Sequence, residues 1–150
     1  MGRQIAILAE CDESDFHIEA WRSGVRVGWA MGSPTEDGRL QLCDIQVFNS
    51  VVRPWPVLTA WMLRFWGPRK SAIFRGQGIG DELLSRFCYE ADRVGFREIF
   101  GYIVEGDAET RPWLLRWYEK HGFAQADPDT ECLPSTRFMV VRPYRGARRP

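Results

Sequence analysis

Apolar and polar residues alternate through the first third of the chain, and this alternation predicts β-strands. Strands are predicted in this way at residues 16–21, 25–31 and 40–48, and a further strand is predicted at residues 5–9, a short run that is apolar throughout. The sequences between them, such as Asp12-Glu-Ser-Asp15 and Ser23-Gly24, are typical of turns, and a tight turn between two strands indicates a β-hairpin. The first third therefore predicts an antiparallel meander.

The second half has the period of a helix. Apolar residues recur three and four positions apart over 81–94, which predicts an amphipathic helix that Gly95 ends. A buried strand at 98–104 follows. A second helix is predicted from Thr110, as its N-cap, to Gly122, and a last strand at 138–141. These elements predict one α/β domain with a mixed, mainly antiparallel sheet flanked by helices.

A segment rich in tryptophan, residues 49–74, separates the two halves. Residues 56–66 can form about three turns of helix, and Gly67-Pro68 ends it. Apolar residues cover most of its circumference, so this inserted helix should be buried against another surface.

Composition limits the class of protein. The chain of 150 residues suits a single domain, and 45% hydrophobic with 27% charged residues is a globular composition. No apolar run approaches the roughly 20 residues that span a bilayer, and no signal peptide is recognised. The four cysteines are scattered without a Cys-x-x-Cys pair and there are only two histidines, which argues against a zinc site. The cysteines are therefore expected to be free, mostly buried thiols in a reducing cytoplasm. The net charge of zero disfavours nucleic-acid binding, and the basic end, 143–150, is expected to be a flexible tail.

The most informative motif is Arg75-Gly-Gln-Gly-Ile-Gly80, which opens the helix predicted over 81–94. Glycine lets the backbone approach a ligand closely, and the unpaired N–H groups of a helix start bind anions. Arg75 adds a charge that pairs with phosphate. A plain glycine-rich loop is the alternative interpretation. No Gly-Lys-Ser/Thr follows, which argues against a P-loop, and the antiparallel meander before the motif argues against a dinucleotide-binding fold.

With this motif the sequence resembles the GNAT acetyltransferase superfamily, whose loop for the pyrophosphate of acetyl-CoA reads Arg/Gln-x-x-Gly-x-Gly/Ala. A second block, Leu115-Arg-Trp-Tyr-Glu-Lys-His-Gly-Phe123, resembles the helix of that family that ends in Tyr-Glu-Lys-x-Gly-Phe. A third, Asp44-Ile-Gln-Val47, resembles the strand that pairs with the pantetheine arm. The similarity covers roughly residues 39–141, without the tryptophan-rich segment.

The resemblance implies a set of cofactor-binding residues and acetyl-CoA as co-substrate. The pantetheine would lie along the backbone of Ile45 and Val47 as an added strand. The pyrophosphate would lie on the amides of the loop, with the side chain of Arg75 beside it. The loop residues concerned are Gly76, Gln77, Gly78, Ile79 and Gly80.

The resemblance also implies attack by a neutral amine on a thioester, which needs a base and a proton donor for the leaving thiolate. Tyr118 matches the donor, and a core tyrosine is its alternative role. Asp44, in line with Leu40 and Leu42 on one strand face, and Glu105, at the end of the next strand, are candidate bases. Asp107 is a further candidate base, and a chain of waters could also take the proton from the amine.

Three departures from the family pattern stand out. Arg111 replaces an asparagine that contacts pantetheine. Only residues 12–15 stand where the family has two helices that form a wall of the acceptor site. The strand and the loop are separated by the 49–74 insertion, so we expect Trp61 and Trp66 either to replace this wall or to pack against a second copy of the chain.

The sequence thus predicts an N-acetyltransferase that moves an acetyl group from CoA to a primary amine, with the acceptor open between small molecules, peptides and proteins. The alternative is a non-catalytic acyl-CoA-binding module that has lost turnover.

Overall fold

The computed structural model describes residues 5–48, 76–126 and 136–145. The first four elements are the strands β1 (Ala6–Cys11), β2 (Phe16–Arg22), β3 (Val25–Pro34) and β4 (Arg39–Val47). After them come α1 (Ile79–Val94), β5 (Glu98–Val104), α2 (Glu105–Thr110), α3 (Leu114–Lys120), β6 (Ala124–Gln125) and β7 (Thr136–Pro143). The predicted meander, the helix over 81–94 and the strands at 98–104 and 138–141 are confirmed.

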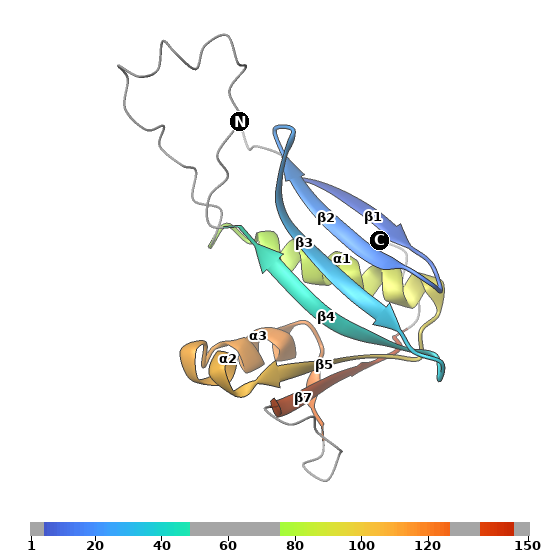
Figure 1. Cartoon of the computed structure of the whole chain (residues 1–150), viewed down its shortest axis with the longest axis vertical. Coiled ribbons are helices and arrows are strands. Elements are labelled where there is room, and N and C mark those ends of the chain that lie inside the picture. Colours follow the sequence, from blue (N-terminus) through green and yellow to red (C-terminus); the bar gives the residue numbers. More distant parts are fainter. Residues whose placement is uncertain (1–4, 49–75, 127–135, 146–150) are drawn as a thin grey trace.

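The strands form one sheet in the order β1-β2-β3-β4-β5-β7-β6. Among the strands that the structure describes, only β4 and β5 pair in parallel, and the other pairs are antiparallel. The predicted mixed, mainly antiparallel sheet is therefore confirmed. Helix α1 lies behind β2, β3 and β4, whereas α2 and α3 lie beside the end of β5 (Figure 1).

The core lies between α1 and the first four strands. Leu83, Leu84 and Phe87 of α1 are fully buried there. The helix approaches the sheet closely at two glycines of β3: a Cβ on Gly32 would lie 2.8 Å from Cζ of Phe87, and one on Gly28 would lie 3.0 Å from Cδ1 of Leu83. These glycines set the depth at which α1, and hence the loop before it, sits against the sheet.

The predicted helix from Thr110 to Gly122 is wrong in its first part. The chain instead forms the short α2, with Thr110 as its last residue and not an N-cap, and begins α3 only at Leu114. The Thr110 hydroxyl donates to the Gly106 carbonyl at 2.7 Å. Pro112 explains the break, because it disfavours helical geometry at Arg111, whose φ of −133° and ψ of 65° end α2.

A tight turn joins β1 to β2, as the sequence predicted. The Asp12 carboxylate accepts hydrogen bonds from the amides of Ser14 and Asp15 at 2.7 and 2.8 Å, which closes the turn. Within the described residues, no helix covers the face of β1–β3 opposite α1 (Figure 1). The described ranges also contain no helix long and apolar enough to cross a membrane, and no cluster of three or more metal-binding side chains.

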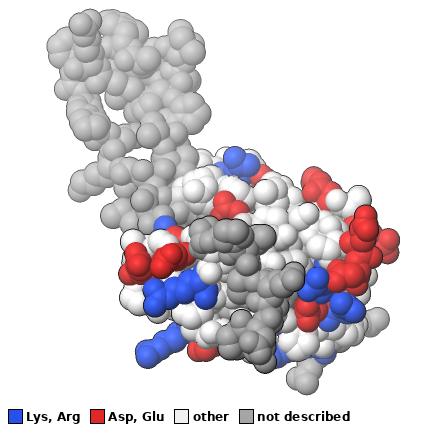
Figure 2. Space-filling model, turned by 60° about the horizontal axis from the view of Figure 1, so that its bottom comes forward, with Lys and Arg blue, Asp and Glu red and all other residues white. Residues whose placement is uncertain are grey.

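Arg142, just before the predicted basic tail, is part of the fold. Arg142 in β7 and Asp92 in α1 are each only 7% exposed and form a bidentate pair at 2.8 and 3.2 Å. Residues 146–150 lie outside the described residues. On the face in Figure 2, acidic and basic side chains are interspersed.

The cysteines are less buried than predicted. Cys88 is buried, Cys11 is partly buried and Cys43 is exposed, while Cys132 lies outside the described residues. All three described thiols are free.

Candidate functional site

The sheet opens between its two parallel strands. Pairing of β4 with β5 begins at Arg39 opposite Glu98 and ends at Leu42 opposite Gly101. Beyond that point β4 stays paired with β3 as far as Val47, and β5 stays paired with β7. The edge of β4 that faces β5 is therefore without a strand partner from residue 43 to 47 in the described structure (Figure 1). The two parallel strands therefore splay apart beyond Leu42 and Gly101.

A β-bulge in β4 corrects the predicted orientation of Asp44. Met31 pairs with Asp44 but Gly32 pairs with Leu42, so Cys43 is the extra residue. The bulge shifts the alternation by one: Ile45 and Val47 pack against the core, whereas Asp44 is exposed. Asp44 therefore does not continue the face of the buried leucines before it, as strict alternation predicted.

The glycine-rich loop lies at the start of α1, at the end of the helix nearest the tip of β4 (Figure 1). Gly76 and Gly78 have φ of 76° and 78°, a left-handed conformation that favours glycine, and Gly78 is the N-cap of α1. A Cβ on either would meet no atom within 4 Å, so the space over the loop is open. The first intrahelical bond is Glu82 N–H to Gly78 O at 3.0 Å, so the amides from Gly78 to Asp81 precede the regular helical pattern.

The other predicted loop residues have distinct environments. Gln77 is exposed, whereas the side chain of Ile79 is buried in the core, so only its backbone can serve a ligand. A Cβ on Gly80 would lie 3.8 Å from Cγ2 of Val47 and 3.6 Å from Cζ2 of Trp117. Gly80 therefore lies where β4, α1 and α3 meet, which places the loop at the mouth of the β4–β5 splay.

Asp81 ties α3 to the start of α1. One of its carboxylate oxygens accepts hydrogen bonds from Nε1 of Trp117 at 3.0 Å and from Nζ of Lys120 at 3.2 Å, and it lies 3.3 Å from Nε2 of His121. Partial burial disfavours the charged form, but the bonds from Lys120 and Trp117 outweigh it and hold the pKa of Asp81 below its ordinary value. These contacts fix the helix that carries Tyr118 relative to the loop.

Tyr118 is the buried residue of α3, where its ring packs edge-on against Phe123 and Trp117. Burial raises the pKa of its hydroxyl to about 12, and the negative charges of Asp44 and Asp107 add to the effect. The phenol is therefore protonated at neutral pH and available as a proton donor.

The candidate bases are placed differently. Asp44 is exposed on β4, and Glu105 is exposed as the first residue of α2. Asp107 is partly buried and lies 3.4 Å from the guanidinium of Arg111. The predicted placement of Glu105 at the end of β5 is confirmed, although it belongs to a helix that the sequence did not predict.

Some predicted residues lie outside the described residues, and others at the site were missed. Arg75, Trp61 and Trp66 belong to the first group, and their roles stay predictions. Asp81 belongs to the second group, as does Arg22 at the end of β2, whose guanidinium donates a hydrogen bond to Gln77 of the loop. The position of Asp81 in the first turn of α1 was a signal, because an acidic side chain is stabilising at the start of a helix.

Comparisons with known proteins agree with this arrangement at the level of the fold. No family model and no curated protein sequence matches the chain. Among solved structures, it is similar to a PaiA N-acetyltransferase from Thermoplasma acidophilum in complex with coenzyme A, with a TM-score of 0.56 and 15% identity over 87% of this chain and 62% of that one. It is also similar to the ribosomal-protein-S18-alanine N-acetyltransferase from Escherichia coli, with a TM-score of 0.56 and 16% identity over 89% of this chain and 72% of that one. A third similar structure is an acetyltransferase of the GNAT family from Staphylococcus aureus. Its TM-score is 0.56, and its sequence identity is 12% over 89% of this chain and 70% of that one.

The chain thus has the fold of the GNAT acetyltransferases. It spans 62% of the length of the Thermoplasma protein and 72% of that of the Escherichia coli protein.

Proposed function

We propose that this protein is an acetyl-CoA-dependent N-acetyltransferase whose acceptor is a primary amine. The observation that carries the proposal is the position of the glycine-rich loop, at the mouth of the opening between β4 and β5. A helix start that binds phosphate and a strand edge that binds an extended amide chain suit the two ends of one ligand.

The residues present fit acyl-CoA. The open space over Gly76 and Gly78 leaves room for a pyrophosphate close to the backbone, where any side chain would intrude. The unpaired edge of β4 from residue 43 to 47 offers N–H and C=O groups to the amides of a pantetheine arm. Acetyl-CoA, when bound, supplies an activated acyl group as a thioester.

Tyr118 supports catalysis and not only binding. Attack by the amine nitrogen on the thioester carbonyl forms a C–N bond and breaks the C–S bond, and the departing sulfur needs a proton. A phenol with a pKa of about 12 is protonated at any physiological pH, so it can give that proton. The amine must lose a proton to the base, for which Asp44 and Glu105 are the candidates.

Thiol release tests this function directly. Purified protein is mixed with acetyl-CoA and a panel of amines that includes small molecules, peptide N-termini and lysine peptides, and free thiol is measured over time. Binding of CoA is measured in parallel by calorimetry. Amine-dependent thiol release supports the proposal, whereas CoA binding without release for every amine supports the acyl-CoA-binding module. Absence of CoA binding overturns both.

Asp44→Asn and Glu105→Gln then identify the base. Loss of the residue that takes the proton from the amine should lower kcat/KM for the amine while leaving the affinity for CoA unchanged, whereas the other variant should change both little. A location in the cytoplasm and association into a homodimer accompany the proposal as predictions, and sedimentation at several protein concentrations tests the second.

A further inference from the structure

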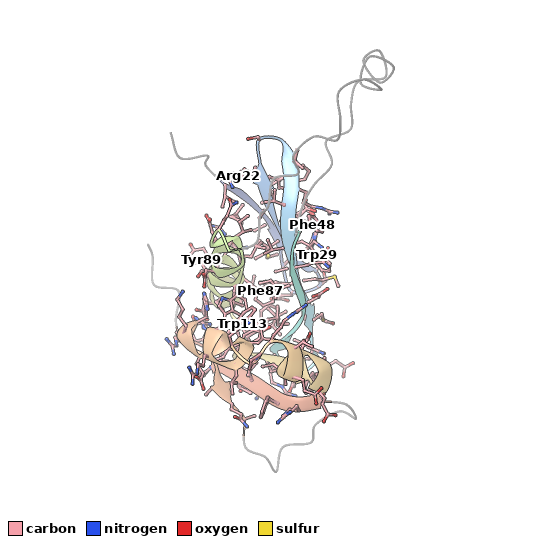
Figure 3. The ribbon with its side chains drawn as sticks, turned by 90° about the vertical axis from the view of Figure 1, so that its left-hand side faces the viewer. Arg22, Trp29, Phe48, Phe87, Tyr89 and Trp113 are labelled. Carbon is pink, nitrogen blue, oxygen red and sulfur yellow. The ribbon has the colours of Figure 1, made fainter. Side chains whose placement is uncertain are left out.

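Arg22 is a cation that the fold brings to the glycine-rich loop from a distant part of the sequence. It is the last residue of β2, and its guanidinium donates a hydrogen bond from Nη1 to Oε1 of Gln77. Figure 3 shows Arg22 above α1, at the upper end of the first strands. The guanidinium thus places a positive charge next to the loop, since it contacts the side chain of a loop residue.

The hydrogen bonding of Arg22 is incomplete in the described part of the chain. Its Nε is buried without a hydrogen-bond partner, and no described carboxylate forms an ion pair with its guanidinium. A guanidinium has five N–H donors and stays charged at every physiological pH. A buried N–H without a partner is destabilising, so the arrangement favours arrival of an acceptor, and an anion most of all.

The neighbouring arginine of the same hairpin behaves differently. Arg26 in β3 donates from Nη1 to the Glu19 carboxylate at 2.7 Å, which neutralises its charge. The two arginines are four positions apart and lie at the same end of the sheet, because β2 and β3 are joined there by Ser23-Gly24. Of this pair, Arg22 is the one whose charge is directed to the loop.

We propose that Arg22 is a phosphate ligand of the acyl-CoA site and pairs with a phosphate group of the bound cofactor. This inference rests on the proposed function, since it requires acyl-CoA at the loop. The contact with Gln77 places the guanidinium beside the loop that would hold the pyrophosphate. The 3′-phosphate of CoA offers the same chemistry, and the experiment separates the two groups.

The test measures the affinities of Arg22→Ala for CoA and for dephospho-CoA, which lacks the 3′-phosphate, by calorimetry against the unaltered protein. Arg26→Ala is the matched control, because it removes the same charge from the same hairpin. We expect Arg22→Ala to weaken CoA binding about 10-fold or more, as loss of a hydrogen bond between charged groups does. Arg26→Ala should change it less than about threefold by the same reasoning, since its charge is already neutralised.

An equal loss for both ligands assigns Arg22 to the pyrophosphate, and a loss confined to CoA assigns it to the 3′-phosphate. An unchanged affinity of Arg22→Ala for both ligands overturns the inference while leaving the proposed function intact. Failure of the unaltered protein to bind CoA overturns the proposed function itself.

A purely supporting role for Arg22, acting through Gln77, predicts a different pattern. In that case Gln77→Ala would weaken binding as much as Arg22→Ala, and the double variant would bind no worse than either single one. A direct phosphate contact predicts that Arg22→Ala still weakens CoA binding in the Gln77→Ala background and reduces its dependence on salt. Arg22→Lys, which keeps the charge, should recover part of the affinity. If Arg22→Ala causes no further loss of CoA affinity in the Gln77→Ala background, the direct contact between Arg22 and phosphate is refuted.

Discussion

Gly78→Ala separates the conformation of the loop from its chemistry, because the structure shows only one physical cost for the new methyl group. The methyl would meet no atom within 4 Å, so it causes no clash. The φ of 78° is the difficulty, since an L-residue in the left-handed region costs about 1–2 kcal/mol relative to glycine. For a chain of this length that corresponds to a fall in Tm of about 2–8 °C.

The protein contains a matched control. Gly38, in the turn between β3 and β4, has a φ of 77°, and its Cβ would also meet nothing within 4 Å. It precedes the start of β4, whereas Gly78 lies near the other end of this strand. Nine residues at roughly 3.3 Å each separate the two ends by about 30 Å. Gly38→Ala should therefore lose the same stability as Gly78→Ala without touching the loop.

Only Gly78→Ala should affect the ligand. Alanine there drives the loop away from the left-handed geometry, which redirects the amides at the start of α1. Loss of one hydrogen bond to a charged phosphate weakens binding about 10- to 150-fold. Thermal unfolding and calorimetry with CoA check both quantities. If the two variants lose similar stability and both bind CoA as well as the unaltered protein does, the pyrophosphate does not lie on these amides.

Three further predictions address the donor, the buried ion pair and the contact between α1 and α3. Tyr118→Phe should lower kcat about 10²–10⁴-fold with CoA affinity unchanged, and a rate within a few-fold of the unaltered protein would make it a core residue. Asp92→Ala should lower the free energy of unfolding by about 3–5 kcal/mol, because the charge of Arg142 stays buried without its partner. Replacing Asp92 with Leu and Arg142 with Met together should restore most of that loss. Chemical denaturation measures both variants, and equal losses for the two would contradict this reasoning. Asp81→Asn should destabilise at neutral pH, with the difference vanishing as the pH falls through the lowered pKa of Asp81, since only the ionised carboxylate is stabilising. A difference that persists at low pH would refute that cause.

The sequence predicted best the elements whose cause is local. The 81–94 helix depends on apolar spacing and on Gly95, which ends it with a φ of 101°. The loop before it depends on glycines whose left-handed geometry the structure confirms at Gly76 and Gly78. In both cases the residues that dictate the conformation are the residues that adopt it, so a single stretch of sequence contains the information.

Elements that depend on a neighbouring strand were predicted less well. The bulge at Cys43 is a feature of the pairing between two strands: Met31 and Gly32 are adjacent in β3, whereas their partners Asp44 and Leu42 in β4 have Cys43 between them. Alternation within β4 alone cannot show this shift, and it placed Asp44 on the wrong face. The pairing of Asp92 with Arg142 was hidden as well, because it joins a helix to a strand 50 positions away in the sequence.

Arg22 shows where such information begins and ends. Strands β2 and β4 run in the same direction because each is antiparallel to β3, so their last residues lie at the same end of the sheet, where the strands finish. The glycine-rich loop enters α1 at that end, and an arginine at the end of β2 could therefore have been predicted to lie near it. The same reasoning also places Arg26 at this end. Only the side-chain contacts distinguish them: Glu19 neutralises Arg26, whereas Arg22 reaches the loop through Gln77. Topology thus brings two arginines of the first hairpin to this end of the sheet, and the charge pairing of the folded chain favours Arg22 over Arg26 as the proposed phosphate ligand.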